Sequence, residues 1–405
     1  MDGGKVLGEG SFGCVFKPGL RCVDKAEHVG NSSGRRGKRG MVSKVFDSQE
    51  DLDTEWDFSK VIAKIDPEQK YFIYGATRCN TSPKQISRDP QHNECSLING
   101  YESKQKFPQI IMKDGGMTFA KYLPDMYEKG TPLTRRDVIR IILPALKGLV
   151  LFAKAGYVHQ DIKTINVVVD PKTQELRIID YSLMKKIKEI YDPEANHKLY
   201  SDYWVNPAEY RVFTALEEVQ KGLDPVKFDP TWKNRFIRKI VDREAETLRF
   251  IHSSSNDRYD LYSKFKMFWR AGEQEETLLK LVNKMIAKPL DKRRTFMTRV
   301  AARSDVYSVG LLIVDVYEWI MSEKKDNYDD VVAFHEIVRG LIHPDPFLRL
   351  TAAKAVKKAE AFLKTVPSKR VPGSSERPVP MSASMGSPGR RSGLGGAGLR
   401  PRASL

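Results

Sequence analysis

The chain has little cysteine and no long hydrophobic run. Only four cysteines occur among 405 residues, at Cys14, Cys22, Cys79 and Cys95. Small secreted domains that depend on disulfides are much richer in cysteine, so this count does not suggest a disulfide scaffold, and we predict free thiols. The longest apolar stretches, 138–155 and 306–320, are interrupted by charged residues. We therefore expect no segment that spans a membrane.

Targeting signals are also scarce, and acidic residues are fewer than basic ones. The N-terminus reads MDGGKVLGEG, which lacks the apolar region of a secretory leader and the second-position glycine of a myristoylation signal. We predict an intracellular, cytoplasmic protein without a membrane partner. Lys and Arg number 68 against 52 Asp and Glu, giving a formal net charge of +16. This balance favours acidic partners such as nucleotides, acidic proteins and nucleic acid.

A zinc site is the alternative use of the cysteines. His92 and Cys95 have the spacing of a ligand pair, Cys79 precedes them, and Cys22 or His28 would complete the set. The sequence contains no second close pair. Free thiols in a loop-rich region are therefore the preferred interpretation.

The most informative stretch is 157–180, which reads YVHQDIKTINVVVDPKTQELRIID. Two short apolar runs, 166–169 and 176–179, flank a turn-prone segment that opens with Asp170-Pro171. This pattern predicts a β-hairpin. The polar residues of the stretch lie before the first run and directly after the second.

A hairpin brings its two ends together, so these polar residues should converge. Asp161 and Asn166 precede the hairpin, and Asp180 follows it. Oxygen-bearing side chains with a lysine beside them, here Lys163, suit the binding of Mg²⁺ and a phosphate while a hydroxyl attacks.

The segment HQDIKTIN resembles the catalytic loop of protein kinases, and IIDYS resembles the Asp-Phe-Gly segment that follows it. The resemblance implies that Asp161 accepts the proton of the attacking hydroxyl and that Lys163 neutralises the transferring phosphoryl group. It also implies that Asn166 and Asp180 hold Mg²⁺. The lysine two positions after the aspartate implies Ser or Thr as acceptor. A coincidental polar loop is the alternative.

The N-terminal segment KVLGEGSFGCVFK carries a second motif of that family. Gly8, Gly10 and Gly13 fit Gly-x-Gly-x-x-Gly, and glycines allow backbone N–H groups to approach phosphate oxygens. Dinucleotide-binding folds use the same spacing before a helix, but here the chain continues as a strand. The kinase resemblance implies that Phe12 is the loop tip and that Val15 packs on the adenine of ATP.

The segment MVSKVF is a predicted strand that resembles the Val-Ala-Ile-Lys element of kinases. By this resemblance Lys44 binds the α- and β-phosphates, with Lys17 as the competing candidate. Residues 47–65 have apolar side chains at helical spacing. Glu55 on that helix would pair with the strand lysine, and Glu50 is the other candidate.

Three further segments are expected to complete the two lobes. Apolar runs at 71–74 and 109–112 predict strands of the small lobe. Residues 135–156 form a long amphipathic pattern that ends at glycine, which predicts a helix leading into the catalytic loop.

Two departures from the family pattern follow. Ser182 replaces the glycine of the metal segment, and Gln160 replaces an arginine that commonly receives an activation-loop phosphate. The second departure predicts an enzyme that does not need loop phosphorylation.

Glu209 and Arg349 resemble the family's buried Glu–Arg pair, and Asp305 would brace the backbone of the catalytic loop.

The resemblance implies an α+β, two-lobed protein-kinase-like fold. We predict a kinase N-lobe at 1–112 with a basic loop insertion at 26–40. A C-lobe at 113–365 would carry a helical insertion at 211–300. Residues 366–405 are rich in Pro, Gly, Ser and Arg and are predicted to be a disordered basic tail.

The resemblance covers roughly residues 5 to 360. Within the family, the chain is similar to the Ser/Thr kinases of large DNA viruses. This narrower resemblance implies a location in the host-cell cytoplasm or in the virion. The kinase resemblance implies ATP- and Mg²⁺-dependent transfer of the γ-phosphoryl group to protein hydroxyls. Three alternatives stay open. They are a pseudokinase-type binding scaffold, a kinase-fold enzyme acting on a small molecule, and a nucleic-acid-binding protein that uses the basic loop and tail.

Overall fold

The computed structural model describes residues 4–10, 13–29, 40–86, 95, 106–131, 133–191, 203–222, 231–249, 261–317, 320 and 328–365. The chain divides into two units, Met1–Val366 and Pro367–Leu405, and every described residue lies in the first. The predicted tail at 366–405 lies outside the described residues. So do residues 30–39, the basic part of the predicted insertion.

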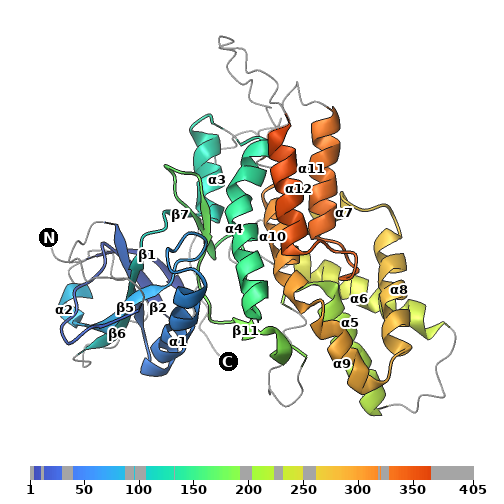
Figure 1. The fold of residues 1–405 in the computed structure, drawn as a ribbon, viewed down its shortest axis with the longest axis horizontal. Coiled ribbons are helices and arrows are strands. Elements are labelled where there is room, and N and C mark those ends of the chain that lie inside the picture. Colours follow the sequence, from blue (N-terminus) through green and yellow to red (C-terminus); the bar gives the residue numbers. More distant parts are fainter. Residues whose placement is uncertain are drawn as a thin grey trace, which may run out of the picture. The chain divides into compact units, whose positions relative to one another are not determined.

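The N-terminal lobe is built on a six-stranded antiparallel sheet with the order β1-β2-β4-β6-β5-β3. Its strands are β1 (Lys5–Gly10), β2 (Gly13–Lys17), β3 (Glu27–His28), β4 (Met41–Phe46), β5 (Gly75–Thr81) and β6 (Phe107–Lys113). Helix α1 (Gln49–Ile65) lies beside this sheet, and the short helix α2 (Pro83–Ile86) follows β5 (Figure 1). The two predicted strands around the glycine motif are confirmed and pair up to Gly10 and Gly13, and the predicted strand MVSKVF is confirmed as well.

Helix α1 forms over the residues that the sequence predicts. Ser48 is its N-cap, and the Ser48 hydroxyl accepts a hydrogen bond from the backbone N–H of Asp51 at 3.1 Å. Such a bond satisfies one of the free donors of the first turn. The buried face of α1 joins the sheet in a small cluster of Phe46, Leu52, Trp56 and Ile110. This packing orients Glu55, which is buried on the same helix.

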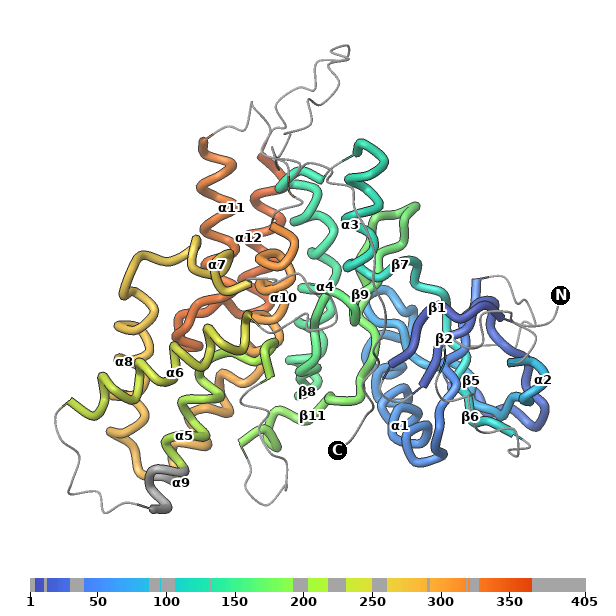
Figure 2. The backbone as a smooth tube through the Cα atoms, turned by 180° about the vertical axis from the view of Figure 1, so that it is seen from behind, coloured from blue at the N-terminus to red at the C-terminus, as the bar shows by residue number. Residues whose placement is uncertain are grey.

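The C-terminal lobe is helical. Its helices are α3 (Phe119–Glu128), α4 (Arg135–Ala155), α5 (Ala208–Gly222), α6 (Trp232–Arg249), α7 (Leu261–Lys266), α8 (Glu273–Ile286), α9 (Leu290–Thr298), α10 (Ser304–Asp315), α11 (Tyr328–Leu341) and α12 (Ala352–Lys364). Helix α4 confirms the helix predicted at 135–156, and Gly156 ends it with a left-handed φ of 80°. Helices α10 and α12 lie beside α4 (Figure 2).

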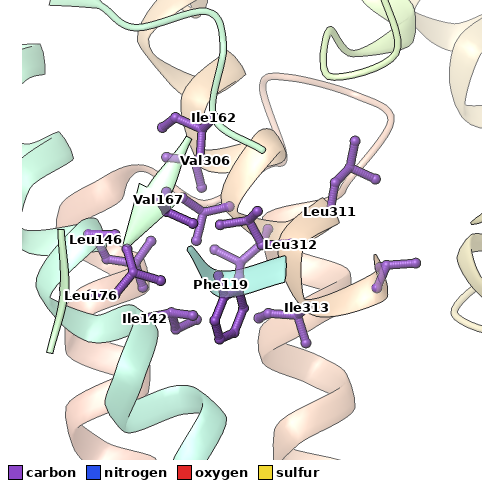
Figure 3. Packing of buried hydrophobic residues seen from close by; sticks show 14 of the residues in the cluster. Phe119, Ile142, Leu146, Ile162, Val167, Leu176, Val306, Leu311, Leu312 and Ile313 are labelled. Carbon is purple, nitrogen blue, oxygen red and sulfur yellow. The ribbon is translucent and has the colours of Figure 1, made fainter. Parts of the chain in front are cut away.

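The predicted hairpin is confirmed and lies between the sheet and the helices. It consists of β9 (Val167–Val169) and β10 (Leu176–Ile178), which pair antiparallel, and β7 (Met117–Thr118) pairs with β9. Strand β8 (Tyr157–Val158) precedes the hairpin in the sequence and β11 (Lys185–Lys186) follows it, and these two strands pair with each other. Figure 3 shows Ile162 and Val167 close to Val306 of α10 in the main core. The loop at 159–166 is therefore held by apolar side chains that flank its polar residues.

The strand predicted at 71–74 is wrong. The carboxylate of Asp66 accepts the backbone N–H groups of Lys70, Tyr71 and Phe72 at 2.7–3.1 Å, so this stretch forms a capped turn after α1. Ile73 N–H then donates to Ile178 O at 3.0 Å. These residues connect the lobes instead of extending the sheet, and β5 begins only at Gly75.

The prediction of free thiols is also wrong, because all four cysteines are paired. Cys14 of β2 is bonded to Cys95 over a sequence separation of 81 residues, and Cys22 is bonded to Cys79 of β5 over 57 residues. The same bonds exclude the zinc interpretation, because both Cys79 and Cys95, which it requires, are in disulfides. His92 lies outside the described residues. Sequence spacing gave no signal for these pairs, since the partners meet only when the sheet and its loops fold.

The α+β, two-lobed architecture that the sequence predicted is confirmed. The segment predicted as a helical insertion contains most of α5 and all of α6 to α9. The boundaries of the lobes at 112 and 365 stay predictions. No helix in the described part of the chain is long and apolar enough to cross a bilayer.

Reduction of the disulfides should destabilise the N-terminal lobe. Chain-entropy estimates give about 4 kcal/mol for each bridge that closes a loop of this length, and the loops here span 81 and 57 residues. Guanidinium unfolding followed by circular dichroism should show a lower midpoint in a phosphine reductant. The unreduced, denatured chain should show no free thiols in a thiol titration, and finding four would contradict the assignment.

Candidate functional site

The hairpin brings the predicted catalytic residues together. The side-chain amide of Asn166 donates to Asp161 Oδ2 at 2.6 Å and to the Asp161 carbonyl at 3.1 Å. On the other side of the hairpin, Ile179 N–H donates to the Asn166 carbonyl at 3.0 Å. Asp180, the next residue, therefore follows a strand that is bonded directly to the loop carrying Asp161.

The backbone of this loop is held by a buried carboxylate from α10. Asp305 Oδ2 accepts the N–H of His159 at 2.7 Å, and Oδ1 accepts the N–H of Gln160 at 2.9 Å. The predicted bracing role of Asp305 is thus confirmed. His159 Nδ1 accepts the N–H of Asp161 at 3.2 Å, and its Nε2 lies 3.2 Å from the Ile179 carbonyl. The histidine consequently links the loop to the strand that precedes Asp180.

Asp180 adopts a backbone conformation that is uncommon for an aspartate. Its φ is +64°, in the left-handed region, and such residues cluster at functional sites. Burial raises the pKa of its carboxyl, but the charge of Lys44 and hydrogen bonds from Ser182 outweigh burial and lower the pKa below its ordinary value. Asp180 is therefore an anion that faces Lys44. Ser182, which replaces the usual glycine, donates its backbone N–H to Asp180 Oδ1 at 3.4 Å.

Lys44 and Glu55 form the expected ion pair. Lys44 Nζ lies 2.5 Å from Glu55 Oε2, and the side chains are only 11% and 9% exposed. Burial lowers the pKa of Lys44, but the carboxylates of Glu55 and Asp180 outweigh it and raise the pKa above its ordinary value. The lysine is thus a fixed cation between two acids. Its predicted contact with the phosphates of ATP stays a prediction.

The competing lysine, Lys17, points elsewhere. Its Nζ pairs with Asp114 Oδ2 at 2.5 Å, and its side chain is 48% exposed. Val15 lies directly opposite Lys44 in the pairing of β2 with β4, so the two side chains share one face of the sheet. Lying on one face of the sheet is what the predicted contacts of Val15 with adenine and of Lys44 with the phosphates require.

The glycines of the motif differ in what surrounds them. A Cβ at Gly13 would lie 2.1 Å from the Val45 carbonyl oxygen. Among the described residues, a Cβ at Gly8 would meet no atom within 4 Å, and one at Gly10 would meet only the Gly13 carbonyl oxygen, at 3.8 Å. Gly13 is therefore required by close packing of β2 on β4. Gly8 and Gly10 leave the surface open, as a phosphate-binding loop needs. Phe12 lies outside the described residues.

Sequence reasoning missed one residue of the site, Tyr203. Its hydroxyl donates a short hydrogen bond to Asp161 Oδ1 and accepts one from Lys163 Nζ at 2.6 Å. Lys163 Nζ also lies 2.9 Å from Asp161 Oδ1. Burial raises the pKa of the Tyr203 phenol, and the charge of Asp161 raises it further. A phenol beside a catalytic motif carries no local pattern, and its 42-residue separation from Asp161 hides the contact.

The side-chain oxygens of Asn166 and Asp180 suit a magnesium ion that binds together with the phosphates of a nucleotide. The amide nitrogen of Asn166 is used on Asp161, which leaves its oxygen as a metal ligand, and Asp180 supplies an ionised carboxylate. Mg²⁺ commonly takes one or two protein oxygens and completes its shell with phosphate and water. No cluster of three or more His, Cys, Asp or Glu side chains suited to a metal occurs among the described residues.

The predicted Glu–Arg pair of the large lobe is confirmed. Arg349 donates to both carboxylate oxygens of Glu209, at 2.6 and 2.8 Å, and both side chains are buried. The pair ties the start of α5 to the segment before α12. Because loss of one partner would leave a buried charge unpaired, the pair contributes to stability.

A double-mutant cycle at Lys44 and Glu55 should give strong coupling in the free energy of unfolding. Lys44→Met leaves the Glu55 carboxylate buried without its cation, and Glu55→Gln leaves the lysine without its acid. Each change alone should cost about 3 kcal/mol, and the double variant should cost about 1–3 kcal/mol less than the sum. Guanidinium denaturation measures both quantities.

The exposed pair of Asp57 and Lys60, 2.7 Å apart on α1, is the control for that cycle. Its coupling should be small because water screens both charges. Equal coupling in the two cycles would show that the Lys44–Glu55 pair is no more important than a surface contact.

Comparisons with known proteins give three kinases. A serine/threonine-protein kinase of Saccharomyces cerevisiae is 23% identical over 186 residues, which are 45% of this chain and 40% of that protein. A probable serine/threonine-protein kinase of Dictyostelium discoideum is 25% identical over 170 residues, which are 40% of this chain and 24% of that protein. A probable casein kinase II subunit alpha homolog of Encephalitozoon cuniculi is 26% identical over 183 residues, which are 43% of this chain and 49% of that protein.

The matched region spans less than half the length of each of these relatives. No model of a known protein family matches the chain. None of the three relatives is viral, and the narrower resemblance to kinases of large DNA viruses stays a prediction. Taken with the two-lobed fold, the three relatives confirm that the resemblance indicated by the motifs is to the eukaryotic-type protein kinase superfamily.

Proposed function

We propose that this chain is an ATP- and Mg²⁺-dependent Ser/Thr protein kinase. It transfers the γ-phosphoryl group of ATP to hydroxyl groups of proteins. The observation that carries the proposal is the grouping of Asp161, Lys163 and Asn166 on one loop that is bonded to the strand leading to Asp180. The charge of the buried Lys44 acts on the Asp180 carboxyl. The names of the three relatives support the same activity.

Asp161 is the general base in this proposal. Lys163 and Asn166 both contact its carboxylate, and these hydrogen bonds hold the carboxylate in one orientation. It would accept the proton of the substrate hydroxyl as the hydroxyl oxygen bonds to the γ-phosphorus. The bond from that phosphorus to the β-phosphate oxygen breaks, and ADP leaves. Catalysis of this kind comes mainly from positioning and charge stabilisation.

The other groups act on the nucleotide. Lys44 would contact the α- and β-phosphates and is held in place by Glu55, while the open glycines Gly8 and Gly10 let backbone N–H groups approach the phosphates. Asn166 and Asp180 would hold Mg²⁺. When bound, the metal supplies positive charge to the β- and γ-phosphate oxygens.

Lys163 favours a protein acceptor of the Ser or Thr type. It lies between the base and Tyr203, 2.6 Å from the phenol oxygen, where it would neutralise the transferring phosphoryl group.

A pseudokinase-type scaffold is the alternative, in which ATP binds without transfer. An intracellular location stays a prediction, and the two disulfides favour an oxidising compartment over a reducing cytosol.

The test is phosphorylation of a generic basic protein, and then of a peptide library, by the purified chain with Mg²⁺ and ATP. Asp161→Ala should lower the rate about 10²–10⁴-fold, as expected for the loss of a general base. Asp180→Asn should lower it too and should weaken the dependence on Mg²⁺. Both variants should still fold, which thermal unfolding checks.

Asp125→Ala is the matched control. Asp125 is paired with Lys129 on the surface of α3, at 2.6 Å, and its loss should leave activity unchanged. Equal rates for the wild type and Asp161→Ala would contradict the proposal. ATP binding that is detectable by calorimetry without transfer to any acceptor would favour the scaffold.

A further inference from the structure

The base of the proposed reaction has no free position for a substrate. A carboxylate offers about four acceptor positions on its two oxygens. At Asp161, Oδ1 accepts from the Tyr203 hydroxyl and lies 2.9 Å from Lys163 Nζ. Oδ2 accepts from the Asn166 amide at 2.6 Å and from Lys163 Nζ at 3.2 Å. A hydroxyl that is to give its proton to Asp161 must first displace one of these three groups.

Tyr203 is the group that an acceptor would replace. Asn166 and Lys163 belong to the same loop as Asp161 and have proposed roles in the reaction. Tyr203 comes from a distant segment and presents a hydroxyl, which is the functional group of a Ser or Thr acceptor. Its oxygen also lies within hydrogen-bond distance of Lys163, so it makes both contacts that an acceptor oxygen needs.

We infer that Tyr203 occupies the acceptor position on Asp161 and competes there with protein substrates. The inference rests on the proposed function and names a residue that controls access to the same site. Because the carboxylate of Asp161 and burial both favour the protonated phenol, Tyr203 remains a hydrogen-bond donor and does not become a nucleophile at neutral pH.

The backbone around Tyr203 limits how the residue can leave. The Tyr203 carbonyl accepts the N–H of Asn206 at 2.9 Å, and the Val205 carbonyl accepts the hydroxyl of Ser308 of α10 at 3.0 Å. The segment is therefore anchored to the core of the large lobe next to Asp305. Because these bonds hold the backbone, we expect Asp161 to be released by rotation of the tyrosine side chain.

The Tyr203→Phe variant separates competition from support. It removes the hydroxyl but keeps the ring, whose centre lies 5.3 Å from Lys163 Nζ. If Tyr203 competes with substrates, the variant should raise kcat/KM for a Ser peptide about tenfold, mainly through a lower KM. This factor is what one hydrogen bond to a charged group contributes. If the hydroxyl instead serves to position Lys163, kcat should fall, and that result would overturn the inference.

Tyr74→Phe is the control. The Tyr74 hydroxyl donates to the Pro67 carbonyl at 3.2 Å in the N-terminal lobe, so its loss removes one phenol hydroxyl without touching Asp161. The control should show the wild-type kcat/KM. An unchanged kcat/KM in Tyr203→Phe as well would also overturn the inference.

A second measurement does not depend on turnover. The chain has 16 tyrosines, and labelling each at Cζ with ¹³C lets the signal that disappears in Tyr203→Phe be assigned. That signal should report a phenol that stays protonated above the ordinary tyrosine range, and Asp161→Asn should move its titration to lower pH. An identical titration in Asp161→Asn would overturn the contact.

The two proposals fail in different ways. If neither the wild type nor Tyr203→Phe phosphorylates any peptide, the proposed function fails, and the titration alone decides whether Tyr203 is bound to Asp161. If the wild type is active and Tyr203→Phe is no better, the proposed function stands and the competition is refuted.

Discussion

One buried carboxylate sets the geometry of the candidate site. Asp305 accepts two consecutive backbone N–H groups, of His159 and Gln160, and Gln160 has a φ of +65°. A left-handed glutamine is unfavourable by itself and persists only where its surroundings impose it. The bend turns Asp161 toward Asn166. The position of Asp161, the proposed general base, thus depends on Asp305, which takes no part in the proposed reaction.

The contacts between the lobes explain why charges from distant parts of the chain meet. Ile178 of the hairpin exchanges backbone hydrogen bonds with Tyr71 and Ile73, which follow α1. The buried Tyr181 hydroxyl lies 2.8 Å from the carbonyl oxygens of both Ile73 and Ile178, which share its single proton. These bonds fix the segment that carries Asp180 to the chain that follows α1. Lys44 therefore faces two acids held by the same framework, which raises its pKa despite burial.

Local signals in the sequence predicted those parts of the fold that local interactions determine. The helix α4 ends at Gly156, the hairpin turns at its Asp-Pro pair, and Asp161, Asn166 and Asp180 lie directly before and after the hairpin, so each feature was readable from neighbouring residues. The turn at 71–74 was misread because its apolar residues suit a strand, whereas the capping carboxylate of Asp66 is not part of a strand pattern. The disulfides and the contact of Tyr203 with Asp161 join residues 42 or more positions apart, and no local pattern encodes such pairs.

The neutral residue at position 160 bears on how the site is kept ordered. The Gln160 side chain donates to the hydroxyl of Tyr210 in α5 at 3.0 Å, and both residues are buried. An arginine in this place would be an unpaired buried cation unless an anion such as a phosphate approached it. Glutamine needs no such partner, since the tyrosine satisfies it. The bond between the catalytic loop and α5 is therefore complete within the unmodified chain, which is the physical basis for expecting activity without phosphorylation of the intervening segment.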